Sequence, residues 1–237
     1  MATVPIAMSG SDHNNQTLRV LTANLYADRL DLAGFRSLLK ELDPDVVLVQ
    51  ELSYPAADVL AEILPHGLLL PDEGHDGRGL ALKAPAEVQV LPMAYRDGLV
   101  ARLAPPGWPF AVEVVNIHMA NPILWPPWAS VRLRRQQLDV LLAYVEHPGP
   151  RLVAGDFNAS PAWPVYRRLA ARLDDAAVLL SKQRGTRPAR TWGPTPSAPR
   201  LLRIDHMFLE GLRPVGRRVV AIPGSDHSGL MVEIEVV

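Results

Sequence analysis

The sequence predicts an α/β protein in which two β-sheets pack face to face and helices cover their outer surfaces. Short runs of β-forming residues recur along the whole chain, while segments with helical spacing fall between them in the first two thirds. One run, Val46–Val49, is apolar throughout, which is typical of a central strand with both faces covered. The length of 237 residues suits one domain with a sizeable core.

The composition excludes several classes of protein and of site. The 48% of hydrophobic and 21% of charged residues are typical of a soluble globular protein, and a net charge of −1 gives no bulk attraction for a polyanion. Because the chain has no cysteine, it forms no disulfide, thiolate zinc site or cysteine nucleophile. No apolar stretch reaches the roughly 18 residues of a membrane span. We expect a soluble monomer, cytoplasmic or exported with a signal peptide that this chain does not show.

The N-terminal part of the chain alternates between strands and helices. Residues 1–17 are expected to be a flexible leader, and residues 18–237 are expected to form a single domain. Leu18–Leu25 alternates and is rich in β-forming residues, which predicts a strand. Asp31–Leu42 has apolar residues at helical spacing, with its first residue as a suitable cap. A second short helix fits Ala56–Leu64.

The rest of the chain is predicted to contain mostly strands, with two more helices. Apolar and β-forming runs predict strands at Gly79–Leu82, Glu87–Leu91, Leu99–Leu103, Phe110–Ile117, Leu152–Ala154, Leu202–Leu209, Val215–Ile222 and Leu230–Val236. Helical spacing predicts helices over Val131–Val145 and Trp163–Leu173. Ser181–Pro199 is rich in Pro, Arg and Gly, so we expect a long polar loop there.

The segment Asn121–Trp128 has an unusual composition, because prolines and tryptophans make up much of it. We expect an irregular loop, since proline disfavours regular structure. Trp125 and Trp128 on this loop could form a substrate wall, anchor the protein at an interface or pack against its body. Arginines near the start of the following helix, among them Arg135, could form a phosphate track or simply a solvated helix face.

Polar side chains recur where the apolar strands end. A buried polar group costs free energy unless it is paired, so this repetition indicates one shared site. Ligand sites in layered α/β folds commonly lie beyond the ends of strands. The residues in question are Asn24, Glu51, His118, Asp156, Asn158, Asp205, His206, Asp226 and His227.

The segment Arg151–Ala159 shows this pattern most clearly. It is predicted to be a short buried strand that stops at Gly155 and is followed by Asp156 and Asn158. A carboxylate and an amide that face one opening suit a phosphate and a hard cation such as Mg²⁺, which takes oxygen ligands. By itself such a segment is more often an ordinary turn, because Gly, Asp and Asn are common where strands end.

Taken in order, these motifs resemble those of the endonuclease/exonuclease/phosphatase superfamily, the DNase I-like fold. The motifs are Asn24, Gln50-Glu51, His118, Gly155–Asn158, Ile204–His206 and Ser225–Ser228, and the resemblance extends over about Leu18–Val237. It implies a four-layer α/β/β/α sandwich of two packed mixed sheets with outer helices. It also implies an enzyme, a Mg²⁺-dependent phosphodiester hydrolase for which Mn²⁺ is a possible substitute. A nuclease that attacks DNA in line with an activated water is the first expectation.

The resemblance implies a role for each of these residues. Glu51 is expected to bind the metal, with Asn24 beside it and Asp226 assisting there or at a second metal. Asp205 is expected to orient the histidine of the last motif. The expected catalytic residues, which act on the water or on the phosphate, are His118, Asp156, Asn158, Asp205 and His227.

The sequence leaves the proton chemistry open. His227 beside a carboxylate can accept a proton from water, or it can stay protonated and bind the phosphate. Asp156, if Asn158 holds it, is a rival base. His118 can contact a non-bridging oxygen or protonate the leaving oxygen. His206 follows Asp205 directly, so its side chain is expected on the opposite face of the strand.

The chain departs from the nuclease branches of the superfamily around the substrate. The strand Arg78–Lys83 resembles the family's glycine-led strand, but it lacks the glutamate that partners the first histidine in DNase I-like enzymes. Leu52-Ser53 stands where that branch has a basic residue that grips DNA. The candidates that remain for substrate contact are Arg78, Trp125, Trp128, Arg135 and Trp192.

Several partners therefore stay open. DNA is the first expectation, because aromatic rings beside arginines can stack on bases. The same tryptophans could enter a lipid interface, which would suit a phospholipid or sphingomyelin phosphodiesterase, and a small phosphate ester is a third option. A non-catalytic binding module would have lost part of the catalytic set, and none of that set is missing.

Overall fold

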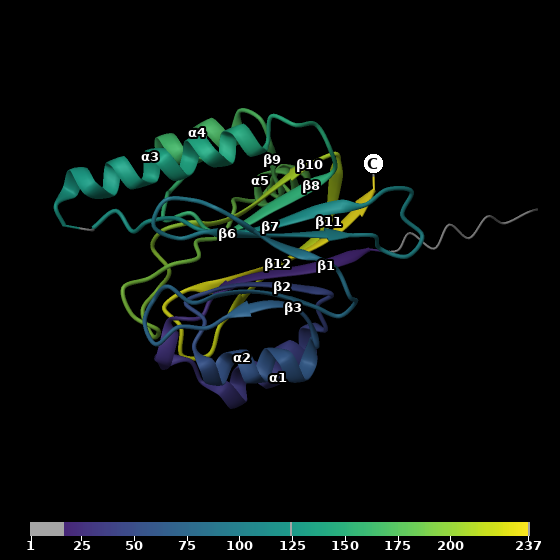
Figure 1. The fold of residues 1–237 in the computed structure, drawn as a ribbon, viewed down its shortest axis with the longest axis horizontal. Helices are drawn as coiled ribbons and strands as arrows, with labels where there is room; N and C mark the ends of the chain where they lie inside the picture. Colours follow the sequence, from purple (N-terminus) through teal and green to yellow (C-terminus); the bar gives the residue numbers. More distant parts are fainter. Residues whose placement is uncertain (1–16, 124, 237) are drawn as a thin grey trace, which may run out of the picture.

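The chain folds into four layers, with two six-stranded sheets in the middle and helices on both outer faces (Figure 1). The computed structural model describes residues 17–123 and 125–236, so all but the last residue of the expected leader lies outside the described part. Both sheets are mixed, because each contains one parallel pair of strands among antiparallel ones. The predicted fold class, an α/β/β/α sandwich of two packed mixed sheets, is confirmed.

The first sheet has the strand order β11-β12-β1-β2-β4-β3. Its strands are β1 Leu18–Asn24, β2 Val46–Gln50, β3 His66–Leu70, β4 Arg78–Leu82, β11 Leu212–Ala221 and β12 Ser228–Val236. β1 and β2 are parallel and pair Asn24 with Gln50, so their C-terminal ends lie side by side. β12 runs antiparallel to β1, so the N-terminal end of β12 lies beside the C-terminal end of β1.

The second sheet has the strand order β5-β6-β7-β8-β10-β9. Its strands are β5 Val88–Leu91, β6 Gly98–Leu103, β7 Val112–His118, β8 Arg151–Asp156, β9 Asp174–Asp175 and β10 Asp205–Glu210. The parallel pair β7 and β8 places His118 opposite Asp156. The antiparallel strand β10 places Asp205 on the other side of Asp156. Three polar residues thus meet at one edge of the sheet.

Helices form the outer layers. They are η1 Ala27–Arg29, α1 Leu32–Leu42, α2 Tyr54–Ile63, α3 Pro127–Tyr144, α4 Pro164–Ala170 and α5 Ala176–Gln183. α1 and α2 lie against the first sheet, and α3 and α4 lie against the second (Figure 1). The predicted cap Asp31 accepts hydrogen bonds from the backbone N–H groups of Ala33 and Gly34, which satisfies donors that an α-helix leaves free at its start.

The core consists of three apolar clusters, one between the sheets and one under each helical layer. The strand β2 contributes to two of them. Val46 and Leu48 lie in the cluster between the sheets, whereas Val47 and Val49 pack under α1 and α2. Successive side chains of a strand point to opposite faces, so a strand covered on both sides needs an unbroken apolar run. The prediction of a doubly covered central strand is confirmed.

Two boundaries differ from the expectation for physical reasons. α3 begins at Pro127, inside the segment expected to be irregular, because proline fits the first turn of a helix where no N–H bond is required. α5 covers Ala176–Gln183, so the expected loop from Ser181 begins with the end of a helix. The Asp175 side chain caps that helix by accepting a hydrogen bond from the N–H of Val178. Within the described residues, no helix is long and apolar enough to cross a membrane.

Candidate active site

The polar ends of the central strands open into one pocket of about 690 Å³. Seven residues predicted from the sequence line it, namely Glu51, His118, Asp156, Asn158, Trp192, Asp226 and His227. Asn24 and Asp205 lie directly behind this lining, where they hydrogen-bond to Glu51 and to His227. The pairing of the strands explains the convergence, because the C-terminal ends of β1 and β2 in one sheet and of β7 and β8 in the other all lie at this pocket.

Asp156 lies at the centre of the pocket and is buried. Its Oδ1 accepts from the backbone N–H of Asn158 at 2.8 Å, and its Oδ2 accepts from Nδ2 of Asn24 at 3.1 Å and from Nδ2 of Asn158 at 3.2 Å. Burial raises the pKa of Asp156 to about 7, against the lowering effect of His227 and of these hydrogen bonds. A carboxyl group of this kind can exchange a proton near neutral pH.

The end of β8 and the turn that follows it require an unusual backbone. Gly155 has a φ of 143°, and a Cβ atom at this position would lie 1.9 Å from the carbonyl oxygen of Ile117. Asn158 has a φ of 48°, in the left-handed region that asparagine tolerates better than most residues. These two positions turn the chain so that the side chains of Asp156 and Asn158 face the same opening.

His227 and Asp205 form a buried pair beside Asp156. Nδ1 of His227 lies 3.1 Å and 3.0 Å from the two carboxylate oxygens of Asp205, and Nε2 lies 3.9 Å from Oδ2 of Asp156. Burial alone lowers the pKa of His227, but the charge and hydrogen bonds of Asp205 outweigh this effect and raise the pKa to about 9. The imidazole is therefore protonated at neutral pH.

Glu51 is held between β1 and a loop. Its Oε1 accepts from Nδ2 of Asn24 at 3.0 Å, and its Oε2 lies 2.5 Å from Nδ1 of His75. The Asn24 amide therefore bridges the carboxylates of Glu51 and Asp156. The sequence predicts only a solvated loop residue at His75, because a histidine in a Gly- and Asp-rich loop carries no spacing signal that relates it to a strand end; its side chain is indeed exposed, but it also contacts Glu51.

The donor set of the pocket fits a hard divalent cation. Glu51 and Asp156 present carboxylate oxygens, and the Nδ2 group of Asn24 donates a hydrogen bond to each of them. Asp226 lies near His227, with its Oδ2 bonded to Nε1 of Trp192 and its buried Oδ1 without a hydrogen-bond partner among the described residues. Oxygen ligands of this kind suit Mg²⁺ or Mn²⁺.

A second grouping of possible ligands overlaps the first. Asp156, Asp205 and His227 can each offer one ligand atom within 4.8 Å of the others. Both carboxylate oxygens of Asp205 already face Nδ1 of His227, however. Asp205 and His227 therefore satisfy each other, whereas Asp156 is shared by both groupings.

His118 contacts an arginine that the sequence did not indicate. Nη1 of Arg96 lies 3.0 Å from Nε2 of His118, and Nε of Arg96 donates to Oδ1 of Asp76 at 2.7 Å. Burial and the Arg96 charge hold the pKa of His118 well below its ordinary value. The order of the strands could have indicated this contact. Arg96 precedes β6, β6 pairs antiparallel with β7, and the start of an antiparallel strand lies beside the end of its partner.

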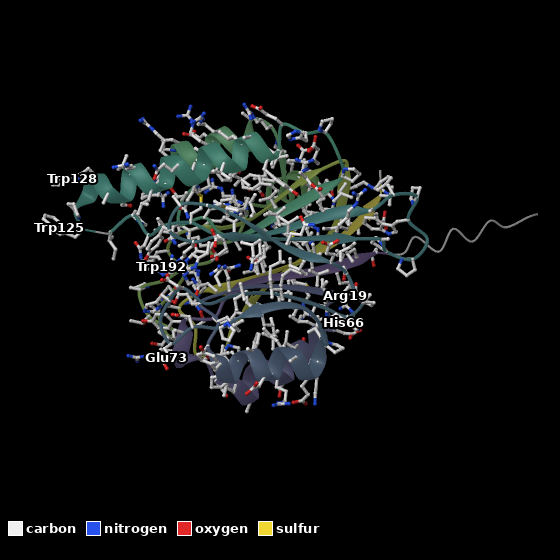
Figure 2. All side chains as sticks on the ribbon, viewed as in Figure 1. Arg19, His66, Glu73, Trp125, Trp128 and Trp192 are labelled. Atoms are coloured by element: carbon white, nitrogen blue, oxygen red, sulfur yellow. The ribbon has the colours of Figure 1, made fainter. Side chains whose placement is uncertain are left out.

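The three tryptophans predicted to contact substrate lie in different parts of the molecule. Trp192 lines the pocket and also pairs with His227 through an isolated β-bridge. Trp125 and Trp128 are 85% and 73% exposed, and Figure 2 shows them together at the outer tip where α3 begins, away from Trp192. They do not line the pocket, although Ile123 of the same segment does.

The predicted arginines lie outside the pocket. Among the described residues that line it, Arg78 and Arg135 do not appear. Nη2 of Arg78 donates to Asp97 at 3.3 Å, and Arg135 is exposed on α3. His206 faces away from the pocket as expected, with Nε2 2.7 Å from the carbonyl oxygen of Ala159 and its ring beside Tyr166.

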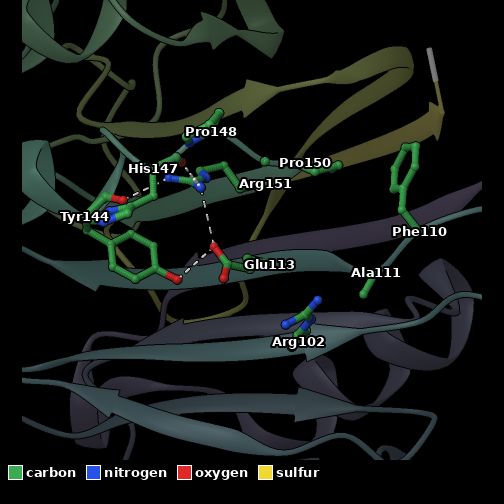
Figure 3. A pocket seen from close by; sticks show the side chains of 10 residues that line it. Arg102, Phe110, Ala111, Glu113, Tyr144, His147, Pro148, Pro150 and Arg151 are labelled. Atoms are coloured by element: carbon green, nitrogen blue, oxygen red, sulfur yellow. Dashed lines mark hydrogen bonds and ion pairs between the residues drawn. The ribbon is translucent and has the colours of Figure 1, made fainter.

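A second cavity of about 450 Å³ lies at the opposite ends of β7 and β8 (Figure 3). Arg151 donates to the carbonyl oxygens of Tyr144 and His147, and Glu113 accepts from the Tyr144 hydroxyl at 2.9 Å. Glu113 also lies 3.7 Å from Nη2 of Arg151. Because these groups bind one another across the strand ends, we assign them a structural role.

Comparison with known proteins identifies what the chain resembles. Residues 21–227 match the family described as the Endonuclease/Exonuclease/phosphatase family. A UPF0294 protein of Vibrio vulnificus strain YJ016 is 33% identical over 124 residues, which are 50% of this chain and 38% of that protein. A UPF0294 protein of Yersinia pseudotuberculosis is 29% identical over 246 residues, with 93% of this chain and 84% of that protein covered. The match thus spans well under half of the Vibrio relative.

Solved structures share the fold. An endonuclease/exonuclease/phosphatase from Beutenbergia cavernae has a TM-score of 0.70 at 22% identity, covering 93% of this chain and 72% of its own. TDP2 of D. rerio, complexed with single-strand DNA product, has a TM-score of 0.68 at 21% identity, covering 93% and 100%. The 3′ phosphatase NExo from Neisseria, bound to product DNA hairpin, has a TM-score of 0.71 at 18% identity, covering 92% and 99%.

Proposed function

Because this chain belongs to the endonuclease/exonuclease/phosphatase family, we propose that it is a Mg²⁺-dependent phosphodiester hydrolase and that DNA is its substrate. One observation carries the proposal. Two groups with different proton affinities, Asp156 with a pKa of about 7 and the His227–Asp205 pair with a pKa of about 9, face one pocket whose other carboxylates offer oxygen ligands. Neighbouring titratable groups whose environments give them different pKa values are typical of an acid–base site.

The metal would be held by the carboxylate of Glu51, with Asp226 as a further oxygen donor, and the Nδ2 group of Asn24 would orient the Glu51 carboxylate. When bound, a divalent cation supplies charge neutralisation for the phosphate oxygens. Mn²⁺ has the same preference for oxygen ligands and is expected to substitute. The donor set supports this assignment, because both Glu51 and Asp226 offer carboxylate oxygens.

Asp156 is proposed as the base that takes a proton from the attacking water. Its pKa of about 7 supports this role, because the carboxylate can accept a proton at neutral pH while remaining ionised in a large fraction of molecules. Its hydrogen bonds to Asn24 and Asn158 hold the carboxylate in one orientation. In-line displacement then needs no covalent intermediate.

His227 is proposed as a positively charged hydrogen-bond donor to the phosphate rather than as a base. Its pKa of about 9 supports this choice, because the imidazolium carries a proton throughout the neutral range. Asp205 holds Nδ1 and leaves Nε2, on the side of Asp156, for the substrate. This arrangement places a positive charge where negative charge accumulates during displacement.

The substrate class is tested with plasmid DNA and bis(p-nitrophenyl) phosphate as separate substrates, each with Mg²⁺, with Mn²⁺ and with EDTA. We expect cleavage of both substrates with either metal and of neither in EDTA. Cleavage of the small diester alone would keep the hydrolase and remove DNA as the substrate. Absence of metal-dependent cleavage of either substrate would contradict the proposed function.

A lipid phosphodiester is the second candidate, and the exposed tip at the start of α3 favours it. Ile123, Trp125, Trp128 and Val131 are 84%, 85%, 73% and 65% exposed. Aromatic rings can stack on bases, but exposed aliphatic side chains such as Ile123 and Val131 gain most from an apolar environment. Ile123 also lines the pocket, so the tip and the pocket are continuous.

Salt dependence separates the two candidates. If the tip contacts nucleic acid beside arginines, binding to single-stranded DNA weakens steeply with salt, and the double substitution of Trp125 and Trp128 by Ala weakens it by about 10-fold or more, because each stacked base contributes about 1–3 kcal/mol. If the tip enters lipid, the same variant loses binding to phosphatidylcholine vesicles with little dependence on salt. Tyr54→Ala, which removes an exposed aromatic ring from α2, is the matched control.

A further inference from the structure

Arg96 is an arginine buried at the wall of the pocket, with only 6% of its surface exposed. Its guanidinium bonds to Asp76 and His118 and lies over the ring of Tyr95, 4.7 Å from the ring centroid. The carboxylate partner is far less buried, since the Asp76 side chain is 55% exposed. An ion pair needed only for stability would gain little from such a partner, because water screens an exposed carboxylate.

The contact between Arg96 and His118 determines which nitrogen of His118 carries the proton. A guanidinium has donors and no acceptor, so Nε2 of His118 must accept the hydrogen bond from Nη1 of Arg96. The proton of the neutral imidazole is then on Nδ1, which is buried and has no hydrogen-bond partner among the described residues. His118 therefore directs no N–H group towards Asp156, although its Nε2 lies 3.7 Å from Oδ2 of that residue.

The donors of Arg96 are not all used by the protein. Nε donates to Asp76 and Nη1 donates to His118. Within residues 17–123 and 125–236, Nη2 donates to no protein acceptor. A guanidinium that is held by two hydrogen bonds and keeps one terminal nitrogen without a protein acceptor is well suited to donate to a phosphate oxygen.

We propose that Arg96 is the donor that binds the substrate phosphate on this side of the pocket, and that His118 acts through it, as the acceptor that holds the guanidinium in place. This assignment rests on the proposed phosphodiester hydrolysis. In this arrangement Arg96 and His227 contact the phosphate from two sides, and Asp156 lies between them. His118 is then a positioning residue.

The first test is replacement of Arg96 by Ala, with bis(p-nitrophenyl) phosphate as substrate. We expect kcat/KM to fall by about 100-fold or more, since removal of one preorganised donor costs about 10²–10³ in rate. Guanidinium chloride at millimolar concentration, far below denaturing levels, should restore part of the activity of this variant. Arg102→Ala removes an exposed arginine of β6 outside the pocket and should leave kcat/KM unchanged.

Two outcomes of this test would overturn the proposal. One is an Arg96→Ala variant whose kcat/KM stays within about threefold of the unmodified protein. The other is a large loss that guanidinium does not reverse although the variant melts at the same temperature, because the arginine would then only hold the loop. Partial recovery in Arg96→Lys, which keeps the charge and loses the planar fork, would support a phosphate contact.

A double-mutant cycle tests the position of His118 in this arrangement. If His118 acts only through Arg96, the variant with both residues replaced by Ala should be no less active than Arg96→Ala alone. A double variant whose loss equals the product of the two single losses would show that His118 acts directly on the substrate. That result would overturn the assigned role of His118.

Binding of inorganic phosphate, measured by titration calorimetry in EDTA, separates this proposal from the proposed hydrolysis. We expect Arg96→Ala to weaken phosphate binding by at least about 10-fold, in keeping with loss of a charge-assisted hydrogen bond. If the unmodified protein binds phosphate through Arg96 and cleaves no phosphodiester, the hydrolysis fails and the Arg96 site stands. Equal phosphate affinities of the two proteins would overturn the Arg96 site itself.

Discussion

Replacement of Asp156 by Asn is expected to lower kcat/KM for a phosphodiester by about a thousandfold, because the variant loses the proposed base. Asn has the same shape but cannot accept a proton. The carboxyl group lies where β7, β8 and β10 meet, within hydrogen-bond distance of Asn24 and Asn158. Steady-state kinetics with bis(p-nitrophenyl) phosphate and saturating Mg²⁺ measures the loss.

The same substitution should leave the fold intact. It removes the cost of burying a charge at Asp156, but it also leaves the amide donors of Asn24 and Asn158 without their carboxylate acceptor. These two effects oppose each other, so we expect the melting temperature in EDTA to change by less than about 4 °C, which corresponds to about 1 kcal/mol. Asp139→Asn on the exposed side of α3 is the matched control, and an active Asp156→Asn variant would contradict the site.

Replacement of His227 by Ala is expected to lower kcat/KM by about a thousandfold, because the pocket loses the imidazolium that would face the phosphate. Asp205→Asn should produce a related loss without removing the ring. Burial lowers the pKa of His227, but the Asp205 carboxylate, with smaller contributions from Asp156 and Asp226, outweighs that effect and raises the pKa to about 9. Without the Asp205 charge, the imidazole should lose its proton at a lower pH.

The pH profile of kcat/KM reports this difference. In the unmodified protein, activity should rise with pH as Asp156 ionises near pH 7 and fall as His227 loses its proton near pH 9. In Asp205→Asn the falling limb should move to lower pH, while the rising limb remains. His147→Ala, which removes an exposed histidine remote from the pocket, should not move either limb. An unmoved falling limb in Asp205→Asn would contradict the role of the pair.

Much of the fold could be predicted because its central strands have simple patterns. The unbroken apolar run of β2 and the alternation of β1 are direct consequences of which faces are covered. The convergence of Asn24, Glu51, His118 and Asp156 could also be predicted, because polar residues that end parallel strands meet at one edge. These inferences need only local sequence and the geometry of a sheet.

The remaining parts depend on contacts between distant segments. His75 and Arg96 reach the pocket from loops, and their partners Glu51 and His118 lie 24 and 22 residues away in the chain. No local pattern contains such a pairing. The exposure of Trp125 and Trp128 likewise depends on how the start of α3 extends beyond the second sheet (Figure 1). α5 was missed because a short helix next to a polar loop has too few turns to show a clear period.

Carboxylates around Asp156 are proposed to support metal-dependent hydrolysis of a phosphodiester. The most direct measurement is turnover of bis(p-nitrophenyl) phosphate by protein stripped with EDTA and then titrated with Mg²⁺. We expect no turnover before Mg²⁺ is added, saturable recovery afterwards, and a higher Mg²⁺ requirement in Glu51→Gln, which loses a carboxylate bonded to Asn24. Equal turnover before and after addition of Mg²⁺ would contradict this proposal.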